Sequence, residues 1–125
     1  IRNSYSAKHR YSLISFSNLN LNIARILKQE GYIKNFEVRQ DLENKKSIYI
    51  DLKYKYVGKG NKPQPILNGI KRVSRPGLRV YSSYKNFPNV LDNIGIAIVS
   101  TSEGVMTSFE ASKRKKGGEI LCFVW

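Results

Sequence analysis

The sequence predicts an α+β fold made of short helices and small, mainly antiparallel sheets. Apolar residues between Leu19 and Leu27 recur at the spacing of one helical face, which indicates an amphipathic helix. Apolar and charged residues alternate between Ile48 and Tyr56, which is typical of a half-buried antiparallel strand. The 125 residues fit one domain or two small lobes that share an interface. Two glycines and two prolines make 57–65 the best candidate for a linker.

In the first half, the helix is bounded by residues that favour helix ends. Ser17 or Asn18 can serve as its N-cap, and Lys28 followed by Gly31 favours a C-terminal turn and stop. A polar turn at 41–45 separates the two strands that follow the helix. The strands expected in this half are 11–16, 32–39 and 48–56.

The second half consists mainly of predicted strands joined by turns. The tetrapeptide at 74–77 predicts a type II turn, because its glycine readily takes the positive φ that this turn needs. A proline predicts a short helix over 88–91. The capping-box spacing of Thr107 and Glu110 predicts a helix over 108–115, which a Gly-Gly pair would end. The strands expected here are 66–73, 78–81, 94–99 and 119–125.

The charge of the chain indicates a polyanionic partner. Lys and Arg total 22 and Asp and Glu total 9, which gives a formal net charge of +13. Solubility alone does not require so much charge, so RNA, DNA or an anionic membrane is the expected partner. The basic residues are interspersed with apolar ones, which favours a folded basic surface over a disordered arm. No run approaches the roughly 18 apolar residues of a membrane-spanning helix. No predicted helix has a basic face opposite a broad apolar one, so a membrane is the least expected of these partners and RNA or DNA is favoured.

Catalysis and metal binding have little support in the sequence. The single histidine, His9, lies between Lys8 and Arg10, and a solvated side chain explains it better than a general base does. The single cysteine, Cys122, lies in an apolar strand and is expected to be buried and unreactive. The acidic residues form no close pair, and no phosphate-binding glycine loop occurs. We therefore expect no enzyme activity, cofactor, metal or small-molecule substrate.

Two basic segments are candidates for phosphate contact. Arg75 and Arg79 flank the predicted turn, with the Lys71-Arg72 pair before it and Tyr81 after it. Arginine can bind phosphate through two parallel hydrogen bonds, and a tyrosine ring can stack on an unpaired base. The second segment is Lys113-Arg114-Lys115-Lys116, at the end of the predicted helix, where cations also favour the helix dipole. A merely solvated role is the alternative for both segments.

Three consecutive hydroxyl residues, Ser100, Thr101 and Ser102, follow the apolar run at 94–99. Short hydroxyl side chains donate and accept hydrogen bonds while allowing close approach. Duplex RNA exposes its 2′-hydroxyls in a wide, shallow minor groove that such side chains can reach. A polar turn that merely ends the strand is the alternative. We expect the basic surface to dominate affinity and the hydroxyl tip and tyrosines to supply placement and selectivity.

Three segments, 74–81, 95–107 and 117–125, together resemble the small-subunit ribosomal protein eight family, of bacterial and organellar type. Their order and spacing agree with the family, and the match continues more weakly over the first half, including the helix and residues 30–33. The ending Ile-Leu-Cys-Phe-Val-Trp is most similar to plastid members.

The resemblance implies two α+β lobes, residues 1–62 and residues 63–125, with the main RNA-binding loop in the second. It implies a structural constituent of the ribosome that binds the central domain of the small-subunit rRNA during assembly. The expected partners are that rRNA and neighbouring ribosomal proteins. The expected location is the ribosome of a plastid, with a mitochondrion or the bacterial cytoplasm as alternatives. Repression of its own operon mRNA is the alternative function, and a nuclease activity would rest on basicity alone.

The resemblance also implies which residues approach RNA. The matching positions are Ser100, Thr101, Ser102 and Gly104 in the main loop, Tyr81 as the base-contacting tyrosine, Glu119 near the loop, and Arg2 and Asn3 in an N-terminal motif.

The chain departs from the family's pattern in four places. One is Asp92-Asn93, which replaces a glycine-rich approach to the strand expected from 94, so we expect that turn to differ. The family's upstream helix start is absent before Ile1, so we expect residues upstream of it to be missing or removed. Ser108-Phe109 stands where Asp-Arg is common, which removes a charge pair beside the tip. The basic run at 113–116 is richer in Lys and Arg than in many relatives, which suggests an added phosphate contact.

Overall fold

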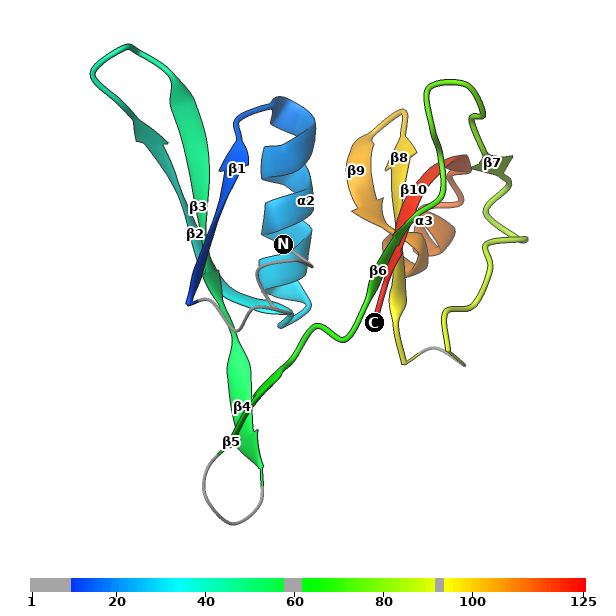
Figure 1. The fold of residues 1–125 in the computed structure, drawn as a ribbon. Helices are drawn as coiled ribbons and strands as arrows, with labels where there is room; N and C mark the ends of the chain where they lie inside the picture. Colours follow the sequence, from blue (N-terminus) through cyan, green and yellow to red (C-terminus); the bar gives the residue numbers. More distant parts are fainter. Residues whose placement is uncertain (1–9, 58–61, 92–93) are drawn as a thin grey trace. The chain divides into compact units, whose positions relative to one another are not determined.

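The computed structural model describes residues 10–57, 62–91 and 94–125. These residues form two helices and several antiparallel sheets, which confirms the predicted α+β class (Figure 1). The chain divides into two compact units, Ile1–Leu67 and Asn68–Trp125. The sequence suggests a boundary at 62/63, and the division by contacts lies between Leu67 and Asn68.

The first unit is a three-stranded antiparallel sheet packed against one helix. The helix, α2, begins after Ser17, whose Oγ accepts a hydrogen bond from the Asn20 amide at 3.0 Å, as the N-cap prediction requires. Leu27, Ile48 and Ile50 are completely buried between helix and sheet. The sheet order is β1-β3-β2. The elements are β1 (Tyr11–Ser15), α2 (Asn18–Gln29), β2 (Ile33–Gln40) and β3 (Lys46–Leu52).

The predicted linker at 57–65 is wrong in part, because it lies largely in a hairpin. Strand β4 (Tyr54–Val57) pairs antiparallel with β5 (Lys62–Pro65) in a separate two-stranded sheet. Proline cannot donate a ladder hydrogen bond but is tolerated in edge strands, and both strands of a two-stranded sheet are edges. The prolines that suggested a linker, Pro63 and Pro65, therefore belong to a paired strand. The two glycines lie within 58–61, outside the described part.

The second unit is a five-stranded sheet with one short helix. The central strands run in the order β6-β10-β8-β9, and β7 also pairs with β10. Ile98, Val99 and Val124 are completely buried, and α3 packs on β8 and β9. The elements are β6 (Ile70–Arg72), β7 (Tyr81–Ser82), β8 (Ile96–Thr101), β9 (Gly104–Thr107), α3 (Ser108–Lys113) and β10 (Gly118–Val124).

Two local predictions for this unit are wrong. No helix forms over 88–91, because Leu91 takes a left-handed φ of 44° that a right-handed helix cannot contain. The turn after Arg75 is not type II. Arg75 and Leu78 exchange two backbone hydrogen bonds of 2.9 Å, and among the described glycines only Gly31 and Gly104 have positive φ. Gly77 therefore closes the turn without the conformation that type II requires.

Both helices end in the same hydrogen-bond pattern, but with different residues at the left-handed position. After α2, Gly31 has φ 80°, and the Tyr32 amide donates to the Leu27 carbonyl. After α3, Lys115 has φ 55°, and the Lys116 amide donates to the Ala111 carbonyl. These bonds define a Schellman motif, in which glycine is the favoured left-handed residue. The second helix thus ends one turn before the Gly-Gly pair that was expected to stop it.

The Schellman motifs predict opposite effects of two substitutions. Lys115→Gly should stabilise the chain by about 0.5–1 kcal/mol, because it relieves a side chain held at positive φ. Gly31→Ala should destabilise it by about 1–2 kcal/mol for the converse reason. Urea unfolding of the two variants measures both shifts, and a loss of stability in Lys115→Gly would contradict the argument.

Candidate nucleic-acid interface

The hydroxyl residues lie at the turn between β8 and β9. Ser100 and Thr101 are the last residues of β8, and Ser102 and Glu103 form the turn. Gly104 begins β9 with φ 118°, and nothing lies within 4 Å of where its Cβ would be. The expected strand at 94–99 is therefore shifted to 96–101, so Ser100 and Thr101 belong to a paired strand and only Ser102 belongs to the turn of the hairpin.

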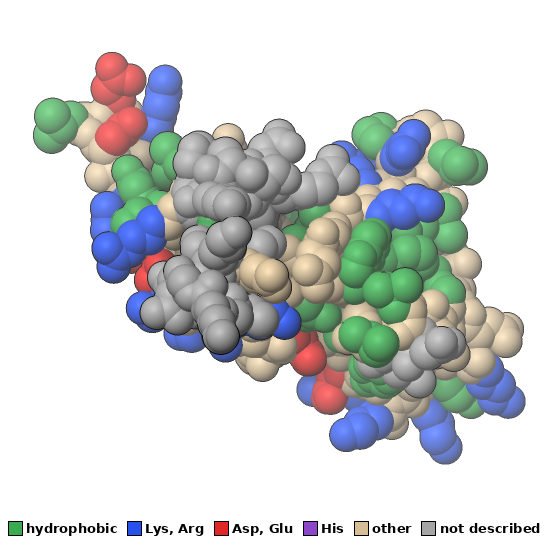
Figure 2. All heavy atoms as spheres, turned by 60° about the horizontal axis from the view of Figure 1, so that its bottom comes forward, with side chains coloured by type: hydrophobic (Ala, Val, Ile, Leu, Met, Phe, Trp, Pro, Cys, Tyr) green, Lys and Arg blue, Asp and Glu red, His purple; other side chains and the backbone are tan. Residues whose placement is uncertain are grey.

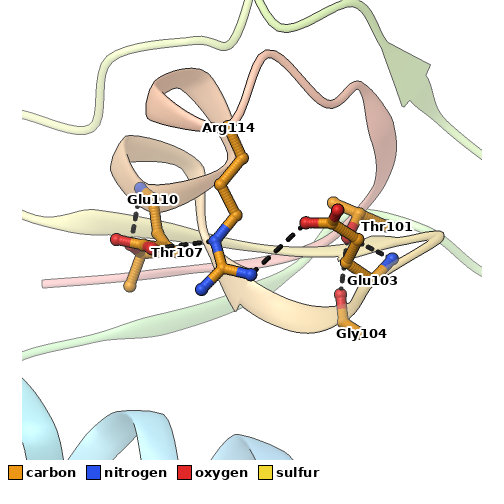
Figure 3. Close-up of polar contacts among 6 residues, drawn as sticks. All are labelled: Thr101, Glu103, Gly104, Thr107, Glu110 and Arg114. Atoms are coloured by element: carbon orange, nitrogen blue, oxygen red, sulfur yellow. Dashed lines mark hydrogen bonds and ion pairs between the residues drawn. The ribbon is translucent and has the colours of Figure 1, made fainter.

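The hydroxyls of the tip have two different roles. The Thr101 hydroxyl donates to the Gly104 carbonyl at 2.9 Å and accepts from the Glu103 amide at 3.1 Å, so it closes the turn (Figure 3). Within the described part of the chain, the side chains of Ser100 and Ser102 make no hydrogen bond. Ser102 is exposed and Ser100 is half-buried. Ser100 and Ser102 therefore carry the hydroxyls that are available to a ligand.

Three of the candidate residues lie in one row across the sheet. Glu119 of β10 is opposite Ser100 of β8 on one side and opposite Tyr81 of β7 on the other. Residues directly opposite each other in neighbouring strands place their side chains on the same face. Tyr81 is well exposed, at 69%. The row therefore places a hydroxyl and an accessible aromatic ring on either side of a carboxylate.

Arg79 holds the carboxylate at the centre of this row. Its Nη1 lies 3.0 Å from Glu119 Oε1, and the Glu119 side chain is only 16% exposed. A mostly buried carboxylate is stable when a cation pairs with it, so Arg79 neutralises the charge of Glu119. The rest of the Arg79 side chain, which is about half exposed, faces solvent. Arg75, on the preceding turn, is exposed and has no ion pair among the described residues.

The Gly-Gly pair before Glu119 allows backbones to approach closely. A Cβ on Gly118 would lie 2.2 Å from the Ser100 carbonyl oxygen and 2.9 Å from its carbon. A Cβ on Gly117 would lie 2.7 Å from the Ser82 carbonyl oxygen. The pair therefore positions β10 against the hydroxyl tip and β7, and this role corrects the expectation that it serves as a helix stop.

The basic run at the end of α3 contains two kinds of cation. Arg114 Nε lies 2.9 Å from Glu110 Oε1, and its Nη1 lies 3.3 Å from Glu103 Oε2 (Figure 3). The hydrogen bond to Glu110, followed by that to Glu103, raises the pKa of Arg114 above its ordinary value. Lys113, Lys115 and Lys116 form no ion pair with any described residue. The three lysines are thus the cations of this run that are free for phosphate.

The candidate residues that the structure describes all lie in the second unit, whereas Arg2 and Asn3 lie outside the described residues. On the face shown in Figure 2, the Lys and Arg side chains of the described residues are distributed rather than gathered in one tail. Sequence reasoning missed Gly118 and Glu103 as parts of the site. Their roles depend on pairing between β8 and β10 and on the contact of the tip with α3, and no local pattern contains either.

Other chemistries find little support in the described part of the chain. Cys122 is buried, and this burial raises the pKa of its thiol to about 11, so little thiolate is available near neutral pH. No group of three or more described His, Cys, Asp or Glu residues is placed to hold a metal ion. None of the described helices combines the length and apolar character needed to cross a membrane.

Comparison with known proteins gives a consistent result. The family described as ribosomal protein S8 matches residues 1–125. The small ribosomal subunit protein uS8c of Phaeodactylum tricornutum is 50% identical over 125 residues, covering 100% of this chain and 91% of the relative. The uS8 protein of Crocosphaera subtropica is 48% identical over 126 residues, covering 100% and 90%. The uS8c protein of Gracilaria tenuistipitata var. liui is 45% identical, covering 100% and 91%.

Proposed function

Because the chain belongs to the ribosomal protein S8 family, and is therefore a structural component of the small ribosomal subunit, we propose that it binds the central domain of the small-subunit rRNA during assembly. The observation that carries this proposal is the row of Ser100, Glu119 and Tyr81 beside the free hydroxyl of Ser102. It combines close-approach hydroxyls with an accessible aromatic ring, which suits irregular or unpaired RNA.

We assign two kinds of contact to this surface. Ser100 and Ser102 would hydrogen-bond sugar or base edges, and Tyr81 would stack on a base, which is worth about 1–3 kcal/mol. The backbone of Gly104, which has no side chain to hold RNA away, would approach it closely. Cations would contact phosphate and fix the register of binding. These cations are Arg75, the solvent-facing part of Arg79, Lys113, Lys115 and Lys116.

The direct test measures whether the whole chain binds its RNA selectively. The affinity of the chain for a central-domain fragment of small-subunit rRNA is compared, at fixed salt, with its affinity for a scrambled duplex of equal length. We expect a preference of about 10³-fold or more, as is typical of specific nucleic-acid sites. Equal affinities for both RNAs would refute the proposed function.

The lysines at the end of α3 predict a specific change in salt dependence. The slope of log affinity against log salt is negative, and each phosphate contact contributes about 0.7–0.9 to its magnitude. Replacing Lys113, Lys115 and Lys116 with Gln should therefore reduce that magnitude by about 2–3. The loss should be similar on both RNAs, because phosphate contacts carry little sequence information. The matched control replaces three lysines of the first unit, Lys28, Lys34 and Lys46. A slope that falls equally in the control would mean that the contacts are not localised at α3.

We also propose that the chain acts in a plastid. The support is the identity of about half to plastid-type uS8c relatives, together with an ending similar to plastid members. Mass spectrometry of small subunits from isolated plastids and from the cytosol would test this location.

A further inference from the structure

A carboxylate in the turn of the proposed RNA-binding tip raises an electrostatic difficulty. Glu103 lies between Ser102 and Gly104, so its charge is one residue from a hydroxyl that would approach RNA. A free carboxylate there would repel phosphate and compete for donors. The contacts of Glu103 therefore bear directly on whether the tip can bind.

Glu103 is linked to α3 through one arginine. Arg114 Nη1 lies 3.3 Å from Glu103 Oε2, while Arg114 Nε lies 2.9 Å from Glu110 Oε1 (Figure 3). Glu110 is itself fixed at the start of α3, where its amide donates to Thr107 Oγ1 at 3.2 Å. A chain of polar contacts thus runs from the tip through Arg114 to the N-cap of the helix.

We infer that Arg114 is a positioning residue for the tip rather than a phosphate contact. It neutralises Glu103 and directs its side chain toward α3, which leaves Ser100 and Ser102 as the groups that the tip presents. Arg114 already faces two carboxylates, whereas Lys113 beside it faces none among the described residues. This inference rests on the proposed RNA-binding function of the tip.

The size of the effect follows from the exposure of the pair. Both side chains are about half exposed, so the attraction is weakened by water and the link biases the turn rather than locking it. We expect Arg114→Gln to lower the preference for the central-domain fragment by about three- to tenfold. The salt slope should stay unchanged, because no phosphate contact is lost.

A double-mutant cycle separates positioning from phosphate contact. Affinities for the fragment and for scrambled duplex are measured for Arg114→Gln, for Glu103→Gln and for both together. Because a neutral amide at position 103 no longer needs a cation, Arg114→Gln should cost less than twofold in the Glu103→Gln background. The neighbouring Lys113→Gln is the control, and it should lower the slope by about 0.9 without changing the preference. Two results together would overturn the inference. The first is a smaller salt slope in Arg114→Gln, and the second is an equal loss of affinity from Arg114→Gln whether position 103 carries Glu or Gln.

A measurement without RNA distinguishes this inference from the proposed function. Hydrogen exchange of the Glu103 amide, which donates to Thr101 Oγ1, should be about three- to tenfold faster in Arg114→Gln than in Lys113→Gln. Equal exchange in the two variants would overturn the positioning role even if the wild-type chain binds RNA selectively. Faster exchange together with unselective binding by the wild-type chain would refute the function while leaving the link to α3 intact.

Discussion

Replacing Ser100 and Ser102 together with Ala should weaken binding to the central-domain fragment by about 5- to 150-fold. Two hydroxyl hydrogen bonds contribute about 1–3 kcal/mol in total, and both hydroxyls are unused within the described part of the chain. Binding to scrambled duplex should change by less than twofold, because non-specific binding depends on phosphate contacts. Filter binding or fluorescence anisotropy at fixed salt measures both affinities.

The matched control for these two hydroxyls lies in the first unit. Ser15 and Ser47 are opposite each other in β1 and β3 and belong to no proposed contact. Replacing both with Ala removes the same number of hydroxyls and should leave both affinities unchanged. A similar loss in this control, or an equal loss on the two RNAs in the tip variant, would mean that the tip does not read the RNA.

Gly118→Ala should cost about 3 kcal/mol of stability and also displace the tip. The new Cβ would lie 2.2 Å from the Ser100 carbonyl oxygen and 3.3 Å from Thr101 Cα. These are backbone atoms of an adjacent strand, so they cannot rotate away, and the two strands must separate. We expect a lower urea midpoint and, under conditions where the variant stays folded, a loss of preference for the central-domain fragment.

Gly77→Ala is the control for this glycine substitution. A Cβ at Gly77 would meet nothing within 4 Å, and its φ is not in the left-handed region. The variant should be as stable as the parent or up to about 1 kcal/mol more stable, because alanine has less freedom in the unfolded chain. If Gly118→Ala were as stable as Gly77→Ala, β8 and β10 would be able to move apart at little cost in free energy, and the argument from their close approach would fail.

The predictions that succeeded from sequence depend on short-range patterns. The helix itself and its N-cap at Ser17 required only neighbours within one or two turns, although Leu19 at the start of the predicted apolar face is exposed. The cap of α3 was equally local, and Thr107 Oγ1 accepts from the Glu110 amide as the spacing predicts. Such patterns are stabilised within a single element, so sequence alone carries them.

The predictions that failed involve residues whose usual preference is overridden by their surroundings. The prolines of 57–65 resemble a linker until pairing between β4 and β5 gives them edge-strand positions. Lys115 takes the left-handed position after α3, where glycine is the usual residue. The row of Ser100, Glu119 and Tyr81 likewise depends on strand register, which joins segments about 20 residues or more apart in the chain. Family resemblance identified these residues, but their physical basis is visible only in the sheet.

The position of β10 has a consequence for how this surface forms during protein synthesis. This strand pairs with β6, β7 and β8, all of which precede it in the chain. A nascent chain folds from its N-terminal side as it emerges, so the first unit has all its strands available well before the second. Tyr81 and Ser100 have no shared neighbour until Glu119 has been translated and β10 inserts between their strands. Until β10 is added, the nascent second unit therefore contains the residues of the proposed interface but not their arrangement. If the proposed function holds, RNA recognition would begin only after β10 has paired.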